Sequence, residues 1–337
     1  MRYFLLGFLF LLIDTARCQS TETLLNPGRV IFYNTENLFD TINDPATDDD
    51  EFLPAGKMQW NTERYKTKLE HLAKVLGALC DSVEPIAIGL AEVENENVLQ
   101  DLIAQPPLKK FNLGIVHHDS RDERGIDVAI LYNRNRLEAS FDAVLQVPLK
   151  DDKTRDIVYL KGFMDEAYPV WIFVNHWSSR HNGKPASDPK RAVEAKVLKD
   201  KIDNLYLGEP FSRVIVMGDF NDNPNDSSVV ALTKGKPAYP EQQQLVNLMT
   251  DLQKQGKCTI KYKSGCDLFD QFLVSSNLQG SNNLYYVRKP GAQIFAPDWL
   301  LFKHPQYGVI PNRTYAGSLY TGGYSDHLPV YFDLIFK

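Results

Sequence analysis

The chain has 337 residues, of which 43% are hydrophobic, 24% charged and 11% aromatic, so it holds enough apolar material for a large core. This composition excludes an intrinsically disordered or fibrous chain, and the length fits either two average domains or one layered α/β domain. The net charge of −6 argues against tight, nonspecific binding of nucleic acid, but not against an enzyme that contacts a few phosphates briefly.

The N-terminus predicts a signal peptide at residues 1–18. The apolar run at 3–13 is shorter than the roughly 20 residues that a transmembrane helix needs. Small residues follow at the two positions that a signal peptidase inspects, so we expect cleavage before Gln19 and a secreted or periplasmic protein. A lipid anchor on Cys18 is the alternative, although Arg17 fits a lipoprotein signal poorly. The rest of the sequence has no apolar run long enough to cross a membrane.

Three cysteines remain after removal of the signal peptide, and export makes disulfides possible. Cys258 and Cys266 are close enough in sequence to close a small bridged loop. Cys80 follows an apolar helical segment and is expected to be a buried free thiol. None of the three has the spacing of a zinc site.

The remaining sequence predicts a short segment at 19–28 and a single, monomeric domain over 29–337. Apolar residues at steps of three and four predict a helix, and they are Tyr65, Leu69, Leu72, Leu76 and Leu79. A second helix is predicted to begin at Asp188 and Pro189, as cap and first residue. Its buried stripe comprises Ala195, Leu198, Ile202 and Leu205. Strands are predicted at 29–34, 86–92, 128–132, 156–162, 170–175, 214–218, 298–302 and 330–336, an order typical of a layered α/β or α+β domain.

Polar residues stand at or just beyond the ends of several of these strands. Asn34 ends the first strand, Glu92 the second, and Asn175 and His176 follow a later one. The ends of strands hold side chains rigidly at one rim of a sheet, where they reach solvent. Taken singly, Asn34 is more often a turn residue, and Glu92 fits an ion pair as well as a metal site.

The most specific motif is Gly-Asp-Phe-Asn at 218–221. Asp219 and Asn221 are two residues apart, so on extended backbone both side chains point the same way and address one reacting centre. An Asx-type turn after a strand is the alternative interpretation.

Near the C-terminus, Asp326 and His327 lie on a glycine-rich loop before the last strand and combine a metal ligand with a titratable base. Asp298 begins a predicted strand, where an ionised group needs a partner. Pairing with a histidine would raise the basicity of that histidine and fix its tautomer. His176 is a second histidine of this kind, although a lone histidine after a strand is more often structural.

In chain order these motifs resemble those of the endonuclease/exonuclease/phosphatase superfamily, to which deoxyribonuclease I belongs, from about Val30 to the C-terminus. Several segments are similar to those of secreted bacterial nuclease-like members. The resemblance implies an α/β (α+β) four-layer sandwich, in which two packed, mainly antiparallel β-sheets are flanked by helices and the site lies at one rim. It also implies that Asn34, Glu92 and Asp326 surround a divalent cation. Oxygen ligands favour Mg²⁺, with Mn²⁺ or Ca²⁺ as alternatives.

The resemblance assigns roles to the other motif residues. Asp219 and Asn221 would orient the nucleophilic water and the phosphate, His176 and His327 would act as acid and base, and Asp298 would orient one of the histidines. Deoxyribonuclease I has a further glutamate paired with its last histidine. The candidates here for that partner are Asp122, Glu123 and Asp127.

Three residues are candidates for substrate binding: Asn175, Arg124 and Arg180. Arginine presents planar donors suited to phosphate, although both arginines fit a solvated surface equally well. The resulting prediction is an exported metal-dependent phosphodiesterase, an endonuclease acting on DNA or RNA by in-line attack of water.

The alternatives are a sphingomyelinase-type phospholipase C, a sugar- or inositol-phosphate phosphatase, and a non-catalytic binding module on the same fold. A phospholipase would need an exposed aromatic hairpin for membrane contact, and residues 284–287 are the candidate.

Overall fold

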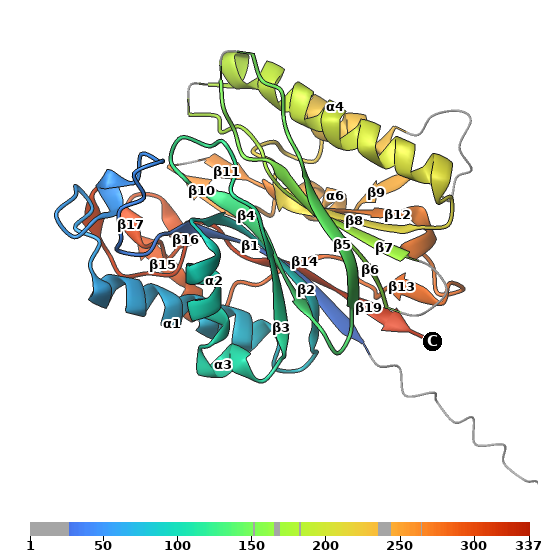
Figure 1. Ribbon diagram of the computed structural model, residues 1–337, viewed down its shortest axis with the longest axis horizontal. Coiled ribbons are helices and arrows are strands. Elements are labelled where there is room, and N and C mark those ends of the chain that lie inside the picture. Colours follow the sequence, from blue (N-terminus) through green and yellow to red (C-terminus); the bar gives the residue numbers. More distant parts are fainter. Residues whose placement is uncertain (1–26, 151, 165–168, 182, 235–243, 264) are drawn as a thin grey trace, which may run out of the picture.

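The computed structural model describes residues 27–337 except 151, 165–168, 182, 235–243 and 264 (Figure 1). The predicted signal peptide, its cleavage site and the alternative lipid anchor at Cys18 lie outside these residues. Export therefore stays a prediction, as do the single domain and the monomeric state. Within the described part of the chain, no helix has the length and apolar character of a membrane span.

The first β-sheet has seven strands among the described residues, and most of its pairs are antiparallel. Their order is β13-β19-β1-β2-β4-β3, with β14 paired to β19 beside this path. Only the pair of β1 and β2 is parallel among these. The strands are β1 (Gly28–Leu38), β2 (Pro85–Val93), β3 (Leu113–His117), β4 (Asp127–Asn133), β13 (Tyr285–Val287), β14 (Gln293–Ile294) and β19 (Val330–Phe336).

The second sheet has six strands in the part of the chain that the structure describes, in the order β5-β6-β7-β8-β12-β9. Here β7 and β8 form the parallel pair. The strands are β5 (Glu138–Leu145), β6 (Ile157–Phe163), β7 (Pro169–His176), β8 (Arg213–Asp219), β9 (Leu245–Asn247) and β12 (Asp270–Ser275).

Each parallel pair exists because a helix carries the chain back along the sheet. Helix α1 (Thr62–Leu79) lies between β1 and β2 in the sequence, and α4 (Lys184–Gly208) lies between β7 and β8. Parallel strands end at the same edge, so both pairs bring the residues at their C-terminal ends to one rim of the molecule.

The two sheets pack face to face, with helices on both outer faces (Figure 1). Gly89 on β2 marks their close approach, because a Cβ atom there would lie 2.9 Å from Met217 Sδ on β8. Helix α1 covers the first sheet together with α2 (Glu96–Ile103) and α3 (Pro106–Lys109). Helix α4 and α5 (Ser227–Thr233) cover the second. The predicted four-layer sandwich is confirmed.

Both predicted helices are present, and their predicted apolar faces are buried. The Asn61 side chain caps α1 by accepting from the backbone N–H groups of Glu63 and Arg64. The predicted start of α4 is wrong, because the helix begins at Lys184 and Pro189 lies inside it. Pro185 takes the place at the helix start where the missing N–H group costs nothing, and Pro189 forgoes one backbone hydrogen bond.

The predicted strands are confirmed except the one at 298–302. There the chain forms a 3₁₀ turn at Asp298–Leu300 that buries Leu300, and strand β15 (Leu301–His304) begins only afterwards. The segment at 284–287 is not a projecting hairpin, because Tyr285 and Val287 are buried in β13 against β19.

Three small hairpins of the described residues lie outside the two main sheets. A disulfide joins Cys258 to Cys266, which lies in β11 (Gly265–Asp267) of the hairpin with β10 (Ile260–Tyr262), and Cys80 is a buried free thiol. The other hairpins pair β15 with β16 (Gly308–Pro311), and β17 (Tyr315–Ala316) with β18 (Leu319–Tyr320). The remaining short helical elements are η1 (Asp50–Phe52), α6 (Thr250–Lys254), η3 (Ser276–Leu278) and η4 (Asp298–Leu300).

Candidate active site

The predicted residues at the strand ends converge on one rim. His176 ends β7 and lies in register with Asp219 at the end of β8. Asp219 is in turn paired with Asp270, the first residue of β12. The three side chains are buried and belong to neighbouring strands of the second sheet.

Asn34 on β1 joins this rim to the first sheet. Its Nδ2 donates to Glu92 Oε1 at 3.3 Å and to Asp219 Oδ2 at 3.1 Å, while its Oδ1 accepts from the backbone of Glu36. Asn34 therefore turns its nitrogen, not its oxygen, toward the carboxylates and holds Glu92 and Asp219 together. It could offer oxygen to a cation only if the amide turned over.

Backbone strain is concentrated at this rim. Glu92 has a φ of 62° and Asn221 a φ of 48°, in the left-handed region that few non-glycine residues adopt. The register of β1 and β2 shifts after Asn34, which marks a bulge. The backbone of Asn37 donates to Glu92 Oε2 at 3.0 Å, and Asn221 donates from its own backbone to Asp219 Oδ1 at 2.9 Å. Strain of this kind is often found at functional sites.

His327 is buried between two carboxylates. Its Nδ1 lies 2.8 Å from Asp270 Oδ2, and its Nε2 lies 3.7 Å from Asp219 Oδ2. Burial lowers the pKa of His327, but the charges of Asp270 and Asp219 outweigh burial and raise that pKa well above its usual value. The two carboxylates therefore favour the protonated form of His327.

His176 faces the same carboxylate from the other side. Its Nε2 lies 3.7 Å from Asp219 Oδ2 and 3.8 Å from Glu92 Oε1, and its Nδ1 has no hydrogen-bond partner among the described residues. Burial lowers the pKa of His176 well below its usual value, and Arg155 and Arg124 lower it further. Burial therefore favours the neutral form of His176, whereas the carboxylates favour the protonated form of His327.

Asp326 stands at the outer side of the rim, with a quarter of its side chain exposed. Arg313 donates to its Oδ2 at 2.6 Å, and its Oδ1 lies 4.0 Å from His327 Nε2. The neighbouring Ser325 donates to the backbone oxygen of Asn34 at 2.7 Å, which fastens this loop to β1.

Asp270, and not Asp298, is the aspartate that lies beside a histidine. Asp298 is exposed in its 3₁₀ turn, and no hydrogen bond or ion pair joins it to a histidine in the described residues. The sequence analysis did not predict β12 and so missed Asp270, although an aspartate two residues before the apolar residues 272–274 was a usable signal.

The predicted substrate-binding residues have other partners. Asn175 is fully buried, donates to the backbone oxygen of Met217 and accepts from the Trp177 indole, so it fastens β7 to β8. Arg180 donates to the backbone oxygen of Asn221 and to two aspartates. Arg124 is half exposed beside Asp122.

The three candidate partners for the last histidine lie elsewhere. Asp122 pairs with Arg155 at 3.0 Å, Glu123 lies 3.7 Å from Lys153, and Asp127 faces His117. Asp270 is thus the carboxylate that holds His327.

The sequence profile of the Endonuclease/Exonuclease/phosphatase family matches residues 29–335. The chain belongs to this family. Its members are metal-dependent phosphoric ester hydrolases, which agrees with a rim of carboxylates and histidines. Among curated protein sequences, none matches the chain significantly.

Solved structures of this family share the fold. TDP2 of D. rerio, in complex with a single-strand DNA product, has a TM-score of 0.55 at 13% identity, covering 91% of this chain and 98% of its own. The catalytic domain of human Nocturnin has a TM-score of 0.54 at 15% identity, covering 93% of this chain and 96% of its own. A family protein of Bacteroides thetaiotaomicron has 0.54 at 17%, with the same coverage of 93% and 96%.

The donor atoms at the rim fit the divalent cation that the family uses. Glu92 and Asp219 accept from the same Asn34 amide, and Asp326 lies beside His327, which faces Asp219. Carboxylate oxygens of this kind are the ligands that Mg²⁺ prefers. Asp219, Asp270 and His327 also offer donor atoms within 4.8 Å of one another. Asp270 Oδ1 is buried without a hydrogen-bond partner among the described residues, while Asp270 Oδ2 faces His327.

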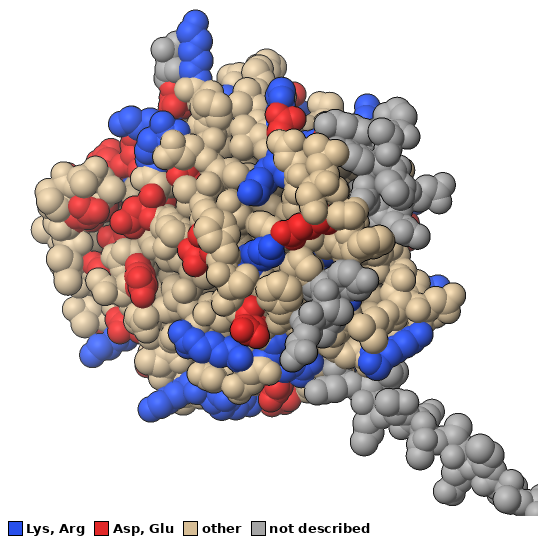
Figure 2. Space-filling model, turned by 45° about the vertical axis from the view of Figure 1, so that its right-hand side comes forward, with Lys and Arg blue, Asp and Glu red and all other residues tan. Residues whose placement is uncertain are grey.

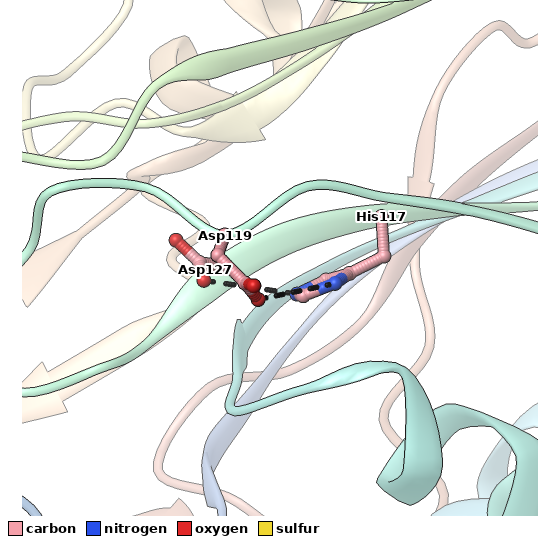
Figure 3. A group of neighbouring side chains, drawn as sticks. All are labelled: His117, Asp119 and Asp127. Carbon is pink, nitrogen blue, oxygen red and sulfur yellow. Dashed lines mark ion pairs between the residues drawn. The ribbon is translucent and has the colours of Figure 1, made fainter. Parts of the chain in front are cut away.

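A second cluster in this family member lies on β3 and β4. Figure 3 shows the carboxylates of Asp119 and Asp127 facing the ring of His117. His117 Nδ1 lies 3.8 Å from Asp119, and its Nε2 lies 3.7 Å from Asp127 and has no hydrogen-bond partner among the described residues. The cluster offers ring nitrogens and two carboxylates, which are donor groups that a divalent cation can use.

Proposed function

We propose that the chain is an exported phosphodiesterase that hydrolyses nucleic acid by in-line attack of water, with Mg²⁺ as its cation and Mn²⁺ or Ca²⁺ as alternatives. The observation that carries this proposal is the position of Asp219. Its Oδ2 is 3.7 Å from Nε2 of both His176 and His327, and the surroundings of the two histidines shift their pKa values in opposite directions.

The two histidines can divide the proton transfers between them. Neutral His176 can accept a proton from the attacking water, which Asp219 orients, and cationic His327 can donate a proton to the leaving oxygen. Asp270 keeps His327 charged and fixes its ring. A cation bound by Glu92 and Asp326 would supply electrostatic stabilisation of the phosphoryl oxygens.

We choose nucleic acid over other phosphodiesters as the proposed substrate. The D. rerio TDP2 structure with a single-strand DNA product supports this choice, since the two proteins share a fold. The segment at 284–287, expected to contact a membrane in a phospholipase, has Tyr285 and Val287 buried in β13, so it gives that alternative no support.

The test is incubation of the purified protein with plasmid DNA, RNA and sphingomyelin, each with Mg²⁺ or with EDTA. We expect Mg²⁺-dependent cleavage of nucleic acid, which Glu92→Ala abolishes without unfolding the protein, as circular dichroism would check. Cleavage of sphingomyelin alone would replace the proposal with the phospholipase. No cleavage of any substrate would favour a binding module.

A further inference from the structure

A hollow lies beside Asp326 and His327 where the three small hairpins meet. This aromatic pocket has a volume of about 380 Å³, within the usual range for ligand sites. The residues that matter for its chemistry are Lys261, Tyr262, Lys263, Phe302, Tyr307 and Arg313.

Two contacts join the pocket to the reacting centre. Arg313 lines the pocket and donates to Asp326 at 2.6 Å. Ile260, the residue before Lys261, forms a bridge to the backbone of His327. A substrate with its phosphate beside Asp326 and His327 would therefore place its neighbouring groups at the pocket.

Aromatic rings line this pocket in positions that favour stacking. Tyr262 is 67% exposed and Phe302 is 48% exposed, although folding usually buries such side chains. Tyr307 is fixed by stacking on His304, with ring centroids 4.5 Å apart. These rings present faces on which a planar group can stack.

The charge of the pocket is opposite to that of the whole chain. Lys261, Lys263 and Arg313 line it, and no acidic residue does so among the described residues, whereas the chain carries a net charge of −6. Lys261 donates to the backbone oxygen of Val309, and the Lys263 ammonium lies 5.2 Å from the Tyr262 ring centroid. Cations interleaved with aromatic rings are what single-stranded nucleic acid requires.

Other occupants fit less well. An adjoining cavity of about 550 Å³ shares Lys261 but is lined by no aromatic ring in the described residues, so it offers no stacking surface. A membrane surface would need rings that project from a convex face, whereas Tyr262 and Phe302 line a hollow.

We propose that the aromatic pocket binds an unpaired base next to the scissile phosphate, so that the enzyme prefers single-stranded nucleic acid. This inference rests on the proposed function and adds the substrate class. A paired base is held within a duplex and cannot enter the pocket without being unstacked, so duplex substrates lose this contact.

The test compares cleavage of a single strand, its duplex and an all-abasic strand of equal length by the full chain and its variants. Tyr262→Ala is expected to raise KM for the single strand by about 5- to 150-fold, to leave kcat unchanged, and to leave KM for the abasic strand unchanged. Tyr262→Trp, which keeps an aromatic ring, is expected to have the wild-type KM for the single strand. Phe141→Ala is the matched control, because Phe141 is 51% exposed on the distant edge strand β5.

The outcomes separate the two proposals. Equal KM values of the wild type for all three substrates, or an unchanged KM in Tyr262→Ala, would overturn the proposed role of the pocket. The proposal that the protein is a nuclease would still stand. Failure of the wild type to cleave any nucleic acid would overturn both. Binding of the wild type to sphingomyelin and phosphatidylserine vesicles, lost in Tyr262→Ala, would instead make the surface a membrane contact.

Discussion

At the scale of single residues, the site places two histidines in opposite environments around Asp219. His327 has Asp270 at its Nδ1, and this carboxylate with Asp219 raises its pKa. His176 has no carboxylate at its Nδ1, and burial with nearby arginines lowers its pKa. The same residue type can thus act as acid and as base within one site, because the environment sets the protonation state.

Replacement of Asp270 tests this division of roles. Asp270→Asn removes the charge that holds His327 protonated, so we expect a rate loss of about 10²–10⁴-fold. Because the pKa of His327 would fall, the loss should be smaller at low pH than at high pH. The measurement is kcat for plasmid or single-strand cleavage across a pH series.

Asp298→Asn is the matched control for this change. The exposed Asp298 lies in the turn before β15 and is not bonded to a histidine in the described residues, so its rate should equal that of the wild type. A large loss in Asp298→Asn with none in Asp270→Asn would restore the role that the sequence suggested for Asp298.

Glu92 allows stability and activity to be separated. Its φ of 62° is costly for a residue with a side chain, by about 1–3 kcal/mol. Glu92→Gly should therefore leave the melting temperature unchanged or higher while cleavage is lost, since glycine adopts this conformation freely. Thermal unfolding and a cleavage assay on the same sample check this. A lower melting temperature would mean that the contact with Asn37 outweighs the strain.

The residues recognisable from sequence were those at the ends of apolar strands. A polar group that ends an apolar run can be recognised locally, and this holds for Asn34, Glu92, His176 and Asp219. Asp270 could not be assigned to His327 in this way. Its position beside His327 depends on the pairing of β12 with β8, and strand pairing is a long-range property.

At the scale of elements, periodicity predicted the long pieces and failed for the short ones. The α1 face and the central strands repeat a pattern over enough residues to be read locally. The hairpins β10–β11, β15–β16 and β17–β18 are two to four residues per strand, too short for a pattern. These hairpins form the aromatic pocket, so the substrate-facing surface was the least predictable part.

Helix α4 supports the site through a buried ion pair. Arg191 is fully buried, and its Nε lies 2.9 Å from Asp222, which follows Asn221. Arg191→Met should lower the free energy of unfolding by about 3 kcal/mol, the lower end of the range for breaking a buried pair. The lower end is expected because Arg180 still pairs with Asp222. Urea unfolding measures this loss.

Another basic residue of α4, Lys196, provides the control. Lys196 on α4 pairs with Asp200 on the surface and is 73% exposed. Lys196→Met should change the free energy of unfolding by less than about 1 kcal/mol. Equal losses in the two variants would show that helix charge, not the buried contact, sets the stability of this layer.

At the scale of the whole molecule, the net charge of −6 is unevenly spread. Figure 2 shows acidic side chains left of centre and basic side chains along the lower edge of the face it displays. Inside the molecule, Glu92, Asp219, Asp270 and Asp326 gather at one rim. Their mutual repulsion opposes folding, so a bound divalent cation should stabilise the entire fold.

Metal removal tests that expectation. At roughly 100-fold excess over Kd, a ligand of the folded state adds about 2.7 kcal/mol of stability, so Mg²⁺ should raise the melting temperature and EDTA should reverse the rise. Glu92→Ala should abolish the rise because the cation loses a ligand, while the melting temperature without metal stays equal or increases. Asp119→Ala distinguishes the cluster around His117 from the rim. If the rise survives Glu92→Ala and disappears in Asp119→Ala, the cation binds at His117, and the active site does not hold the ion that stabilises the protein.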